Sequence, residues 1–485
     1  MSERGDTESS PTPGSQTSAS QTSPSQTSAS SRSDDSSPGG VLSPAYRWTT
    51  IGMCSLVFLV AFEALAVTTV MPVISRQLHG QSLYALAFAA PIAVGVIGTV
   101  AAGNWSDRSG PKPVLMLSVA LFAVGLIVAG TAQSMMILIL GRSLYGLAGG
   151  AMTVALYVVV ARAYPPALHP KIFAGFSAAW VVPSLIGPFI AGLVAQFLSW
   201  HWVFLGVVVL VFAAMGLVWR ILPRIALGHS GGGGRWSVRR MGWSVLAAAG
   251  VFALSLSAEL PVAVSWPAAI VAAVLVVLFL RPLVPAGTFR AARGMPAGIL
   301  VLLLAGGAFA AAETYVPYFL TTSYGLEPAA AGLALTGGAL AWSAGSFMQS
   351  RLDTRLSSRA CVRIGLSLIG IAVLGLVVMA VLRLSPGVAF AVWVFAGGGM
   401  GTMLPRLNTV ILGGSAPSEQ GFTSSAMTIA NSMGNSIAVA FAGVAFATLA
   451  PFGTSAVIGC FILAAVIWAI AFAVGGRATF KPSGT

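Results

Sequence analysis

The chain has 485 residues, of which 56% are hydrophobic and only 8% are charged. A water-soluble domain carries about three times that share of charged residues, so the composition excludes a soluble fold and indicates an all-α polytopic membrane protein. The formal net charge of +13 does not indicate a nucleic-acid partner, because the basic residues lie between apolar runs. The three cysteines and four histidines are dispersed, which predicts neither a disulfide framework nor a metal site.

The first segment, residues 1–47, is rich in serine, threonine, glutamine and proline, with near-repeats of SQTSA between residues 15 and 29. Such a composition buries too little apolar area to offset the entropy of ordering, so we expect a disordered tail. The first apolar run lacks the features of a cleavable signal peptide.

Fourteen apolar runs follow, and most have the length of about 20 residues that crosses a bilayer as a helix. They are continuously apolar and do not alternate, which predicts helices and not barrel strands. The runs lie near residues 49–71, 83–102, 114–132, 136–160, 173–197, 202–221, 242–260, 266–281, 297–320, 329–349, 362–382, 386–411, 422–449 and 454–475.

The placement of basic residues predicts the topology. An even number of spans puts both termini on one side of the membrane. Of the 25 lysines and arginines, only Arg76 and Arg383 fall at the opposite face, and Arg142 and Arg406 lie inside runs. The positive-inside rule therefore predicts a multi-pass protein of the plasma or inner membrane with both termini in the cytoplasm.

The runs repeat after about 250 residues. Glu63 in the first run and Glu313 in the ninth are 250 residues apart, and a polar stretch at 103–112 has a degraded echo at 350–359. This spacing predicts two related six-helix halves, residues 48–222 and 297–475. Residues 223–296 are then a linker with two additional membrane helices, and 476–485 a cytoplasmic C-terminus.

The stretch at 103–112 carries the pattern G-x-x-x-D-R-x-G-x-K. It resembles the signature loop between the second and third helices of the major facilitator superfamily, which implies a major-facilitator-type fold and a cytoplasmic gate made by Gly103, Asp107, Arg108, Gly110 and Lys112. We expect a tight turn permitted by the glycines, with Asp107 pairing to a basic residue. Pro111 stands where the family usually has a basic residue. The simpler alternative is a turn carrying ordinary positive-inside charge.

The arrangement of six, two and six helices resembles the 14-helix drug:proton antiporter branch of that superfamily. In the fifth run, Gly187, Pro188 and Gly192 resemble the antiporter motif G-x-x-x-G-P-x-x-G-G, which in the family seals the cavity against proton leak. Pro183 and Ala191 replace glycines of the motif. The alternative is a proline kink without a role in transport.

Four charges inside the apolar runs are the candidates for proton coupling and substrate binding: Glu63, Glu313, Arg142 and Arg406. Desolvation disfavours a charged carboxylate, so an intramembrane glutamate can hold a proton and release it when a cation approaches. Glu63 lies nine residues before Pro72, at the distance of the acid in the family's helix-1 pattern, and Arg142 with Gly146 resembles its helix-4 pattern R-x-x-x-G. The alternatives are structural, hydrogen-bonded acids and arginines that snorkel to a membrane face.

Seven further residues lie on helices that the resemblance places around the central cavity. Aromatic rings there can stack on a lipophilic cation, although packing or helix–helix hydrogen bonding explains each residue individually. These candidates are Tyr157, Trp180, Tyr315, Tyr318, Asn408, Asn431 and Asn435.

The resemblance implies proton-coupled efflux of small amphipathic molecules, such as drugs or antibiotics, by alternating access. The chain carries no catalytic motif and no nucleotide-binding loop. We therefore expect no enzyme activity, no cofactor other than the proton gradient as energy source, and a monomer whose partners are protons, a small-molecule substrate and the bilayer. Three alternatives remain: an exporter of an endogenous metabolite, lipid or siderophore, a nutrient importer of the same fold, and a non-transporting sensor.

Overall fold

The computed structural model describes residues 40–44, 46–165, 168–219, 238–352, 355–415, 420–453 and 455–478. Most of the predicted tail at 1–47, the beginning of the predicted linker, and the last residues of the predicted C-terminus lie outside these ranges.

The described residues form fourteen α-helices and no strand, so each of the fourteen predicted runs is confirmed as a helix. Twelve of the helices are long and apolar enough to cross a membrane. The other two are α6, whose apolar part is His201–Leu217, and α10, which carries several polar residues. The helices are α1 (Arg47–Gln77), α2 (Tyr84–Ser109), α3 (Pro111–Gly130), α4 (Met135–Ala163), α5 (His169–Phe197), α6 (His201–Trp219), α7 (Val238–Leu256), α8 (Val262–Leu280), α9 (Met295–Ser323), α10 (Pro328–Arg351), α11 (Ser358–Leu382), α12 (Gly387–Gly413), α13 (Gln420–Leu449) and α14 (Ser455–Gly475).

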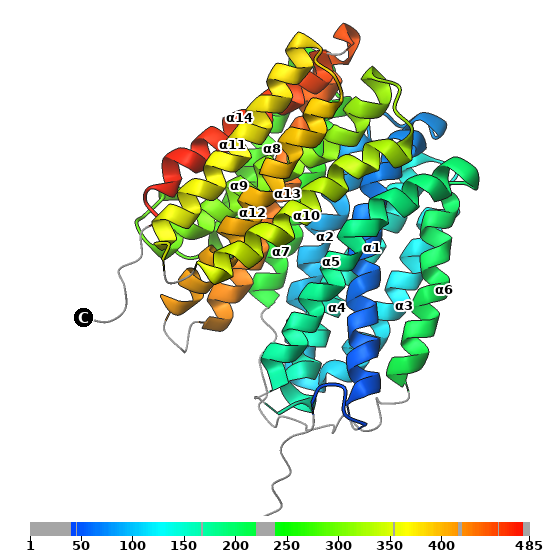
Figure 1. The fold of residues 1–485 in the computed structure, drawn as a ribbon, viewed down its shortest axis with the longest axis vertical. Coiled ribbons are helices and arrows are strands. Elements are labelled where there is room, and N and C mark those ends of the chain that lie inside the picture. Colours follow the sequence, from blue (N-terminus) through cyan, green and yellow to red (C-terminus); the bar gives the residue numbers. More distant parts are fainter. Residues whose placement is uncertain are drawn as a thin grey trace, which may run out of the picture. The chain divides into compact units, whose positions relative to one another are not determined.

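The packing of the helices confirms the predicted duplication. In the first bundle, α1 packs against α5 and α6, α4 against α2 and α3, and α3 against α6. The same pairs recur when eight is added to each number: α9 with α13 and α14, α12 with α10 and α11, and α11 with α14. Figure 1 shows α1–α6 as one group of helices and α9–α14 as another.

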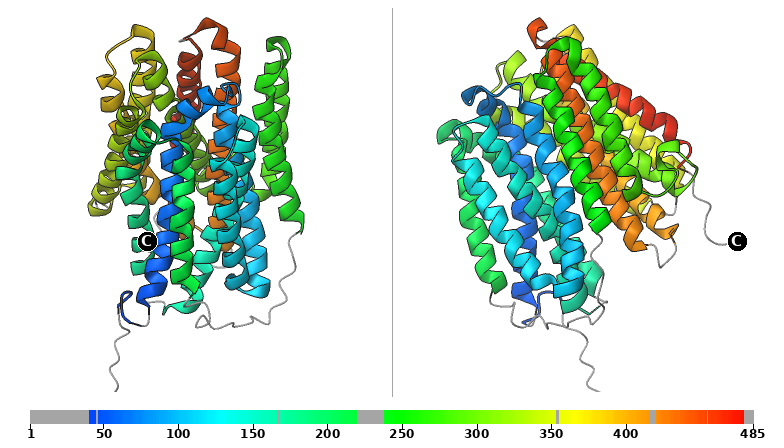
Figure 2. Two further views of the ribbon diagram at one scale, coloured as in Figure 1. Left: turned by 90° about the vertical axis from the view of Figure 1, so that its right-hand side faces the viewer. Right: turned by 180° about the vertical axis from the view of Figure 1, so that it is seen from behind.

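The two additional helices pack on each other, and one of them, α7, contacts both bundles. α7 packs on α8, on α2 of the first bundle and on α13 of the second, and α8 also touches α13. The right-hand view of Figure 2 shows these green helices beside orange α13 and blue α2. The insertion therefore covers the junction of the two bundles along the α2–α13 side.

Glycines allow equivalent helices of the two bundles to approach closely. A side chain at Gly146 of α4 would collide with the backbone of Pro91 in α2, and one at Gly397 of α12 with the backbone of Gly338 in α10. Membrane helices associate without a hydrophobic driving force, mainly through van der Waals packing. Small residues at such crossings allow this close packing. Gly146 in the fourth run and Gly397 in the twelfth run thus have a structural role.

We expect Gly146→Ala to lower the stability of the purified protein by about 1–3 kcal/mol, because the added methyl group meets backbone atoms that have no room to move. Gly149→Ala is the matched control on the same helix, since its nearest neighbour would be Val60 Cγ1 at 3.9 Å. Thermal unfolding in detergent measures both variants, and equal midpoints would contradict the close α2–α4 packing.

Candidate proton and substrate pathway

Glu63 is buried in the first bundle, with 2% of its surface exposed. Its Oε1 atom has no hydrogen-bond partner among the described residues. The charge of Arg142 in α4 acts on its carboxyl group, and Tyr145, one turn further along α4, lies close to it as well. A buried charge is costly unless an opposite charge compensates it. Glu63 on α1 and Arg142 on α4 have opposite charges and can compensate each other.

Arg142 lies inside the protein, with 4% of its surface exposed. This burial argues against the alternative that it snorkels to the outer face. Its guanidinium carbon is 5.1 Å from the ring centroid of Phe88 in α2 and 5.7 Å from that of Tyr145. The Nε and Nη1 atoms find no hydrogen-bond acceptor in the described part of the chain. The guanidinium is therefore held by ring faces and the Glu63 charge, with donors left over for a ligand or water.

The second bundle does not repeat this pair. Glu313 is partly exposed and lies 18 residues after the start of α9, about 27 Å along the helix axis. Arg406 Nε donates to Ser358 Oγ over 3.0 Å, in the first turn of α11. Because α9 and α11 begin at the same end of the bundle, Arg406 is at that end and Glu313 is far from it. The structure thus brings together two of the four predicted charges, Glu63 and Arg142.

The seven softer candidates fall into two environments. Tyr157 and Trp180 are exposed by 51% and 46%, and Tyr157 lies against Phe173 and Phe176 of α5 with ring centroids 5.3 and 6.1 Å away. Tyr315 and Tyr318 are buried between the bundles. The first pair has surface available for a ligand, whereas the second is packed in this structure.

The asparagine candidates also separate. A side chain at Gly306 of α9 would meet the Oδ1 atoms of Asn431 and Asn435 at 2.6 and 2.8 Å, so these α13 amides face the α9 backbone. Asn435 Oδ1 has no hydrogen-bond partner among the described residues. Asn408 is half-buried on α12. Asn431 and Asn435 therefore line a helix contact inside the second bundle.

An aromatic cluster joins the two bundles at the end where α2 begins and α9 ends. The Tyr84 hydroxyl of α2 donates to the Thr314 carbonyl of α9 over 2.9 Å. The Tyr84 ring lies 5.4 Å from Tyr315 and 5.1 Å from Tyr318, and both of these also pack on Phe446 of α13. Sequence reasoning missed Tyr84, because it is the first residue of its helix and no repeat or motif marks it.

The predicted antiporter motif lies at a second contact between the bundles. A side chain at Gly192 of α5 would collide with Ala329 of α10, and one at Gly332 of α10 would approach the Pro188 carbonyl at 2.8 Å. Gly187 instead faces Phe62 of α1, within its own bundle. These two contacts between the bundles, α2–α9 and α5–α10, are at the end opposite residue 47, which the positive-inside rule predicts to be external.

The expected loop at 103–112 is wrong in its local structure. α2 continues through this polar stretch to Ser109, α3 begins at Pro111, and the helices are separated by Gly110 alone, with φ 79°. Glycine, asparagine, serine and aspartate are weak helix formers, so the helix continues here against the local propensity of the stretch. Only Gly110 has the positive φ for which glycine is suited. Gly103 is helical, and a side chain there would meet no neighbouring atom within 4 Å.

The other gate candidates are placed only in part. Arg108 is exposed and Lys112 half-buried, while the side chain of Asp107 lies outside what the structure describes. Arg162, near the end of α4, was not predicted. Its Nη2 donates to the Ser106 carbonyl over 3.3 Å, and this carbonyl also accepts the Gly110 N–H over 3.0 Å.

Comparisons with known proteins agree with this architecture. The chain is 27% identical over 458 residues to the probable multidrug-efflux transporter Rv1634 of Mycobacterium tuberculosis, covering 90% of this chain and 95% of that protein. It is 26% identical over 172 residues to the multidrug efflux pump SdrM of Staphylococcus aureus, which covers 35% of this chain and 38% of the pump.

Solved structures show the same fold. A POT family transporter in complex with a thioalcohol-conjugated peptide superposes with a TM-score of 0.65 at 14% sequence identity, covering 88% of this chain and 94% of that one. The family model described as the Major Facilitator Superfamily matches residues 53–439. The duplicated bundles and this match lead to one conclusion: the chain is a membrane transporter that belongs to the major facilitator superfamily.

Proposed function

We propose that this transporter exports small amphipathic molecules, such as drugs or antibiotics, in exchange for protons. The observation that carries the proposal is the buried pair of Glu63 and Arg142, in which a carboxylate that can take up a proton is compensated by one arginine. The names of the relatives in Mycobacterium tuberculosis and Staphylococcus aureus support export of drugs.

The exchange cycle follows from what protonation does to this pair. When Glu63 is ionised, it offsets the buried charge of Arg142; when Glu63 takes up a proton, Arg142 loses its compensation and must find water or another anion. Each protonation state therefore favours a different arrangement of α1 and α4. We propose that this preference is transmitted to the contacts of α1 with α5 and α9 and so drives alternating access.

The substrate is proposed to bind between the bundles. Tyr157 and Trp180 are exposed, and Glu313 is a half-buried acid. Such a combination suits an amphipathic, preferably cationic, molecule. We further propose that the protein acts as a monomer in the cell membrane, with both termini in the cytoplasm and no cofactor.

The direction of transport is tested in membrane vesicles from a bacterial host that lacks its main drug pumps. We expect everted vesicles with the protein to accumulate ethidium when respiration acidifies their interior, and a protonophore to abolish this accumulation. Dipeptides should not accumulate in right-side-out vesicles. Proton-driven dipeptide uptake without ethidium transport would instead support an importer, as would ethidium accumulation confined to right-side-out vesicles.

A further inference from the structure

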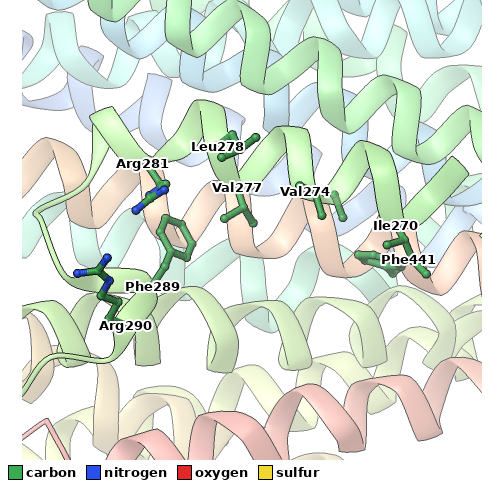
Figure 3. Close-up of a pocket in the computed structure, with 9 residues that line it drawn as sticks. Ile270, Val274, Val277, Leu278, Arg281, Phe289, Arg290 and Phe441 are labelled. Carbon is green, nitrogen blue, oxygen red and sulfur yellow. The ribbon is translucent and has the colours of Figure 1, made fainter. Parts of the chain in front are cut away.

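The α8 helix presents an apolar groove away from the path between the bundles. Ile270, Val274 and Leu278, spaced four residues apart, are exposed by 56%, 53% and 46%. With Val277 and with Phe441 of α13 they line a pocket of about 460 Å³. Figure 3 shows Ile270, Val274, Val277 and Leu278 in a row along α8, with Phe441 beside Ile270.

One end of the groove is strongly basic. Arg281 follows the last residue of α8, and Arg290 belongs to the short 3-10 turn Thr288–Arg290. Both are exposed, and the Phe289 ring lies between them at the pocket end (Figure 3). The described residues that line the pocket include no acidic side chain, so this end attracts anions.

The turn that carries Arg290 is structured. Gly287 and Ala291 on its two sides adopt left-handed conformations, and Thr288 Oγ1 donates to the Pro285 carbonyl over 2.7 Å. The Gly294 N–H then donates to the Arg477 carbonyl over 3.1 Å, which ties the segment to the end of α14. The arginine is therefore presented by a defined backbone and not by a free chain.

The dimensions of the groove match one membrane leaflet. Arg281 lies eleven residues after Ile270, which corresponds to about 16 Å along a helix. Half of the hydrocarbon core of a bilayer is about 15 Å thick. When Arg281 and Arg290 lie at the headgroup level, the apolar part of the groove reaches about the depth of one acyl chain.

We infer that this groove binds an anionic glycerophospholipid, with its phosphate between Arg281 and Arg290 and an acyl chain along Ile270, Val274 and Val277. Charge complementarity distinguishes this occupant from a zwitterionic lipid, and the apolar depth distinguishes it from a free phosphate ion. Because α7 contacts both α2 and α13, and α8 packs on α7 and α13, the bound lipid contacts the insertion at the junction of the bundles. The inference is independent of the transported substrate.

The test compares lipids and variants on the purified, delipidated full-length protein. Binding is measured by thermal shift with phosphatidylglycerol and with phosphatidylcholine of the same acyl chains. An arginine near the membrane surface contributes about 1 kcal/mol to the binding of an anionic lipid, which is about five-fold in affinity. We therefore expect the Arg281→Gln, Arg290→Gln double variant to bind phosphatidylglycerol about 25-fold more weakly and phosphatidylcholine unchanged.

Two controls separate a defined site from general attraction. Arg359→Gln with Arg363→Gln removes the same charge from exposed residues at the predicted cytoplasmic end of α11 and should leave the affinity unchanged. Val277→Trp fills the groove and should weaken lipid binding although both arginines remain. Equal losses in the two arginine pairs, unchanged binding in Val277→Trp, or stabilisation by inorganic phosphate alone equal to that by the lipid would each overturn the inference.

Discussion

Glu63→Gln is expected to abolish proton-driven export of ethidium. Exchange of ethidium across the membrane without a proton gradient should continue. Glutamine has nearly the shape of glutamic acid but can neither take up nor release a proton. The bundles of the variant can still rock with substrate bound, whereas no proton gradient can drive them. Uphill accumulation in energised vesicles measures proton-driven export. Counterflow in vesicles without a proton gradient measures exchange.

The substitution also leaves Arg142 buried without its compensating carboxylate. A buried charge without compensation destabilises the folded protein, so we expect a lower unfolding temperature as well. Glu259→Gln is the matched control, because Glu259 is exposed between α7 and α8. Normal uphill export by Glu63→Gln would contradict the proton-carrying role, and loss of export in Glu259→Gln would show that the assay responds to any glutamate.

The same transport assay also tests the role of the second acid, Glu313. It has partial exposure and stands apart from Arg406, so we assign it to substrate and not to the coupling pair. Glu313→Gln should therefore weaken transport of cationic ethidium while a neutral substrate still moves uphill. The two glutamates, equivalent in the sequence repeat, are thus expected to differ in function.

Gly192→Ala is expected to prevent the bundles from closing at the predicted external end. The added methyl group would collide with the backbone of Ala329 at the start of α10, and overpacking of this kind costs about 1–3 kcal/mol. If the strain is confined to the closed state, the equilibrium shifts by about 5- to 150-fold towards the opposite conformation. Export then falls, because the cycle cannot return through the state described here.

Spin labels at Gln81 and Glu327 report this shift, since both residues are exposed just before α2 and α10, which begin on different bundles at the predicted external end. In a background in which the three cysteines are replaced by alanine, Gly192→Ala should increase the population with a long label separation. Gly187→Ala serves as the control on the same helix, because its added methyl group meets only the Phe62 ring, at 3.4 Å. An unchanged distance distribution in Gly192→Ala would refute the closing role of this contact.

The helices could be predicted because the bilayer imposes a length and a continuous apolar character on each span. The duplication could be predicted because Glu63 and Glu313, and the polar stretches at 103–112 and 350–359, recur about 250 residues apart. The loop at 103–112 could not, since hydropathy reports where the chain leaves the membrane and not where a helix ends. Only the backbone shows that Gly110 alone interrupts it.

The partners of the buried charges could not be predicted from the sequence either. The rotation and tilt of α1 and α4 decide that Glu63 meets Arg142, and packing sets both. Tyr84 was missed for another reason: its hydrogen bond to Thr314 joins helices 230 residues apart in one conformational state. Contacts that exist in one state of a transporter leave no periodic signal in its sequence.

The coupling of export to protons is tested most directly by proton movement itself. The purified protein is reconstituted in proteoliposomes with a pH-sensitive dye trapped inside, and an ethidium gradient is imposed without any initial pH difference. We predict proton flow opposite to ethidium flow with the wild-type protein, and ethidium flow without proton flow with Glu63→Gln. Ethidium flow by the wild-type protein without proton movement, or with protons moving in the same direction, would contradict proton-coupled export.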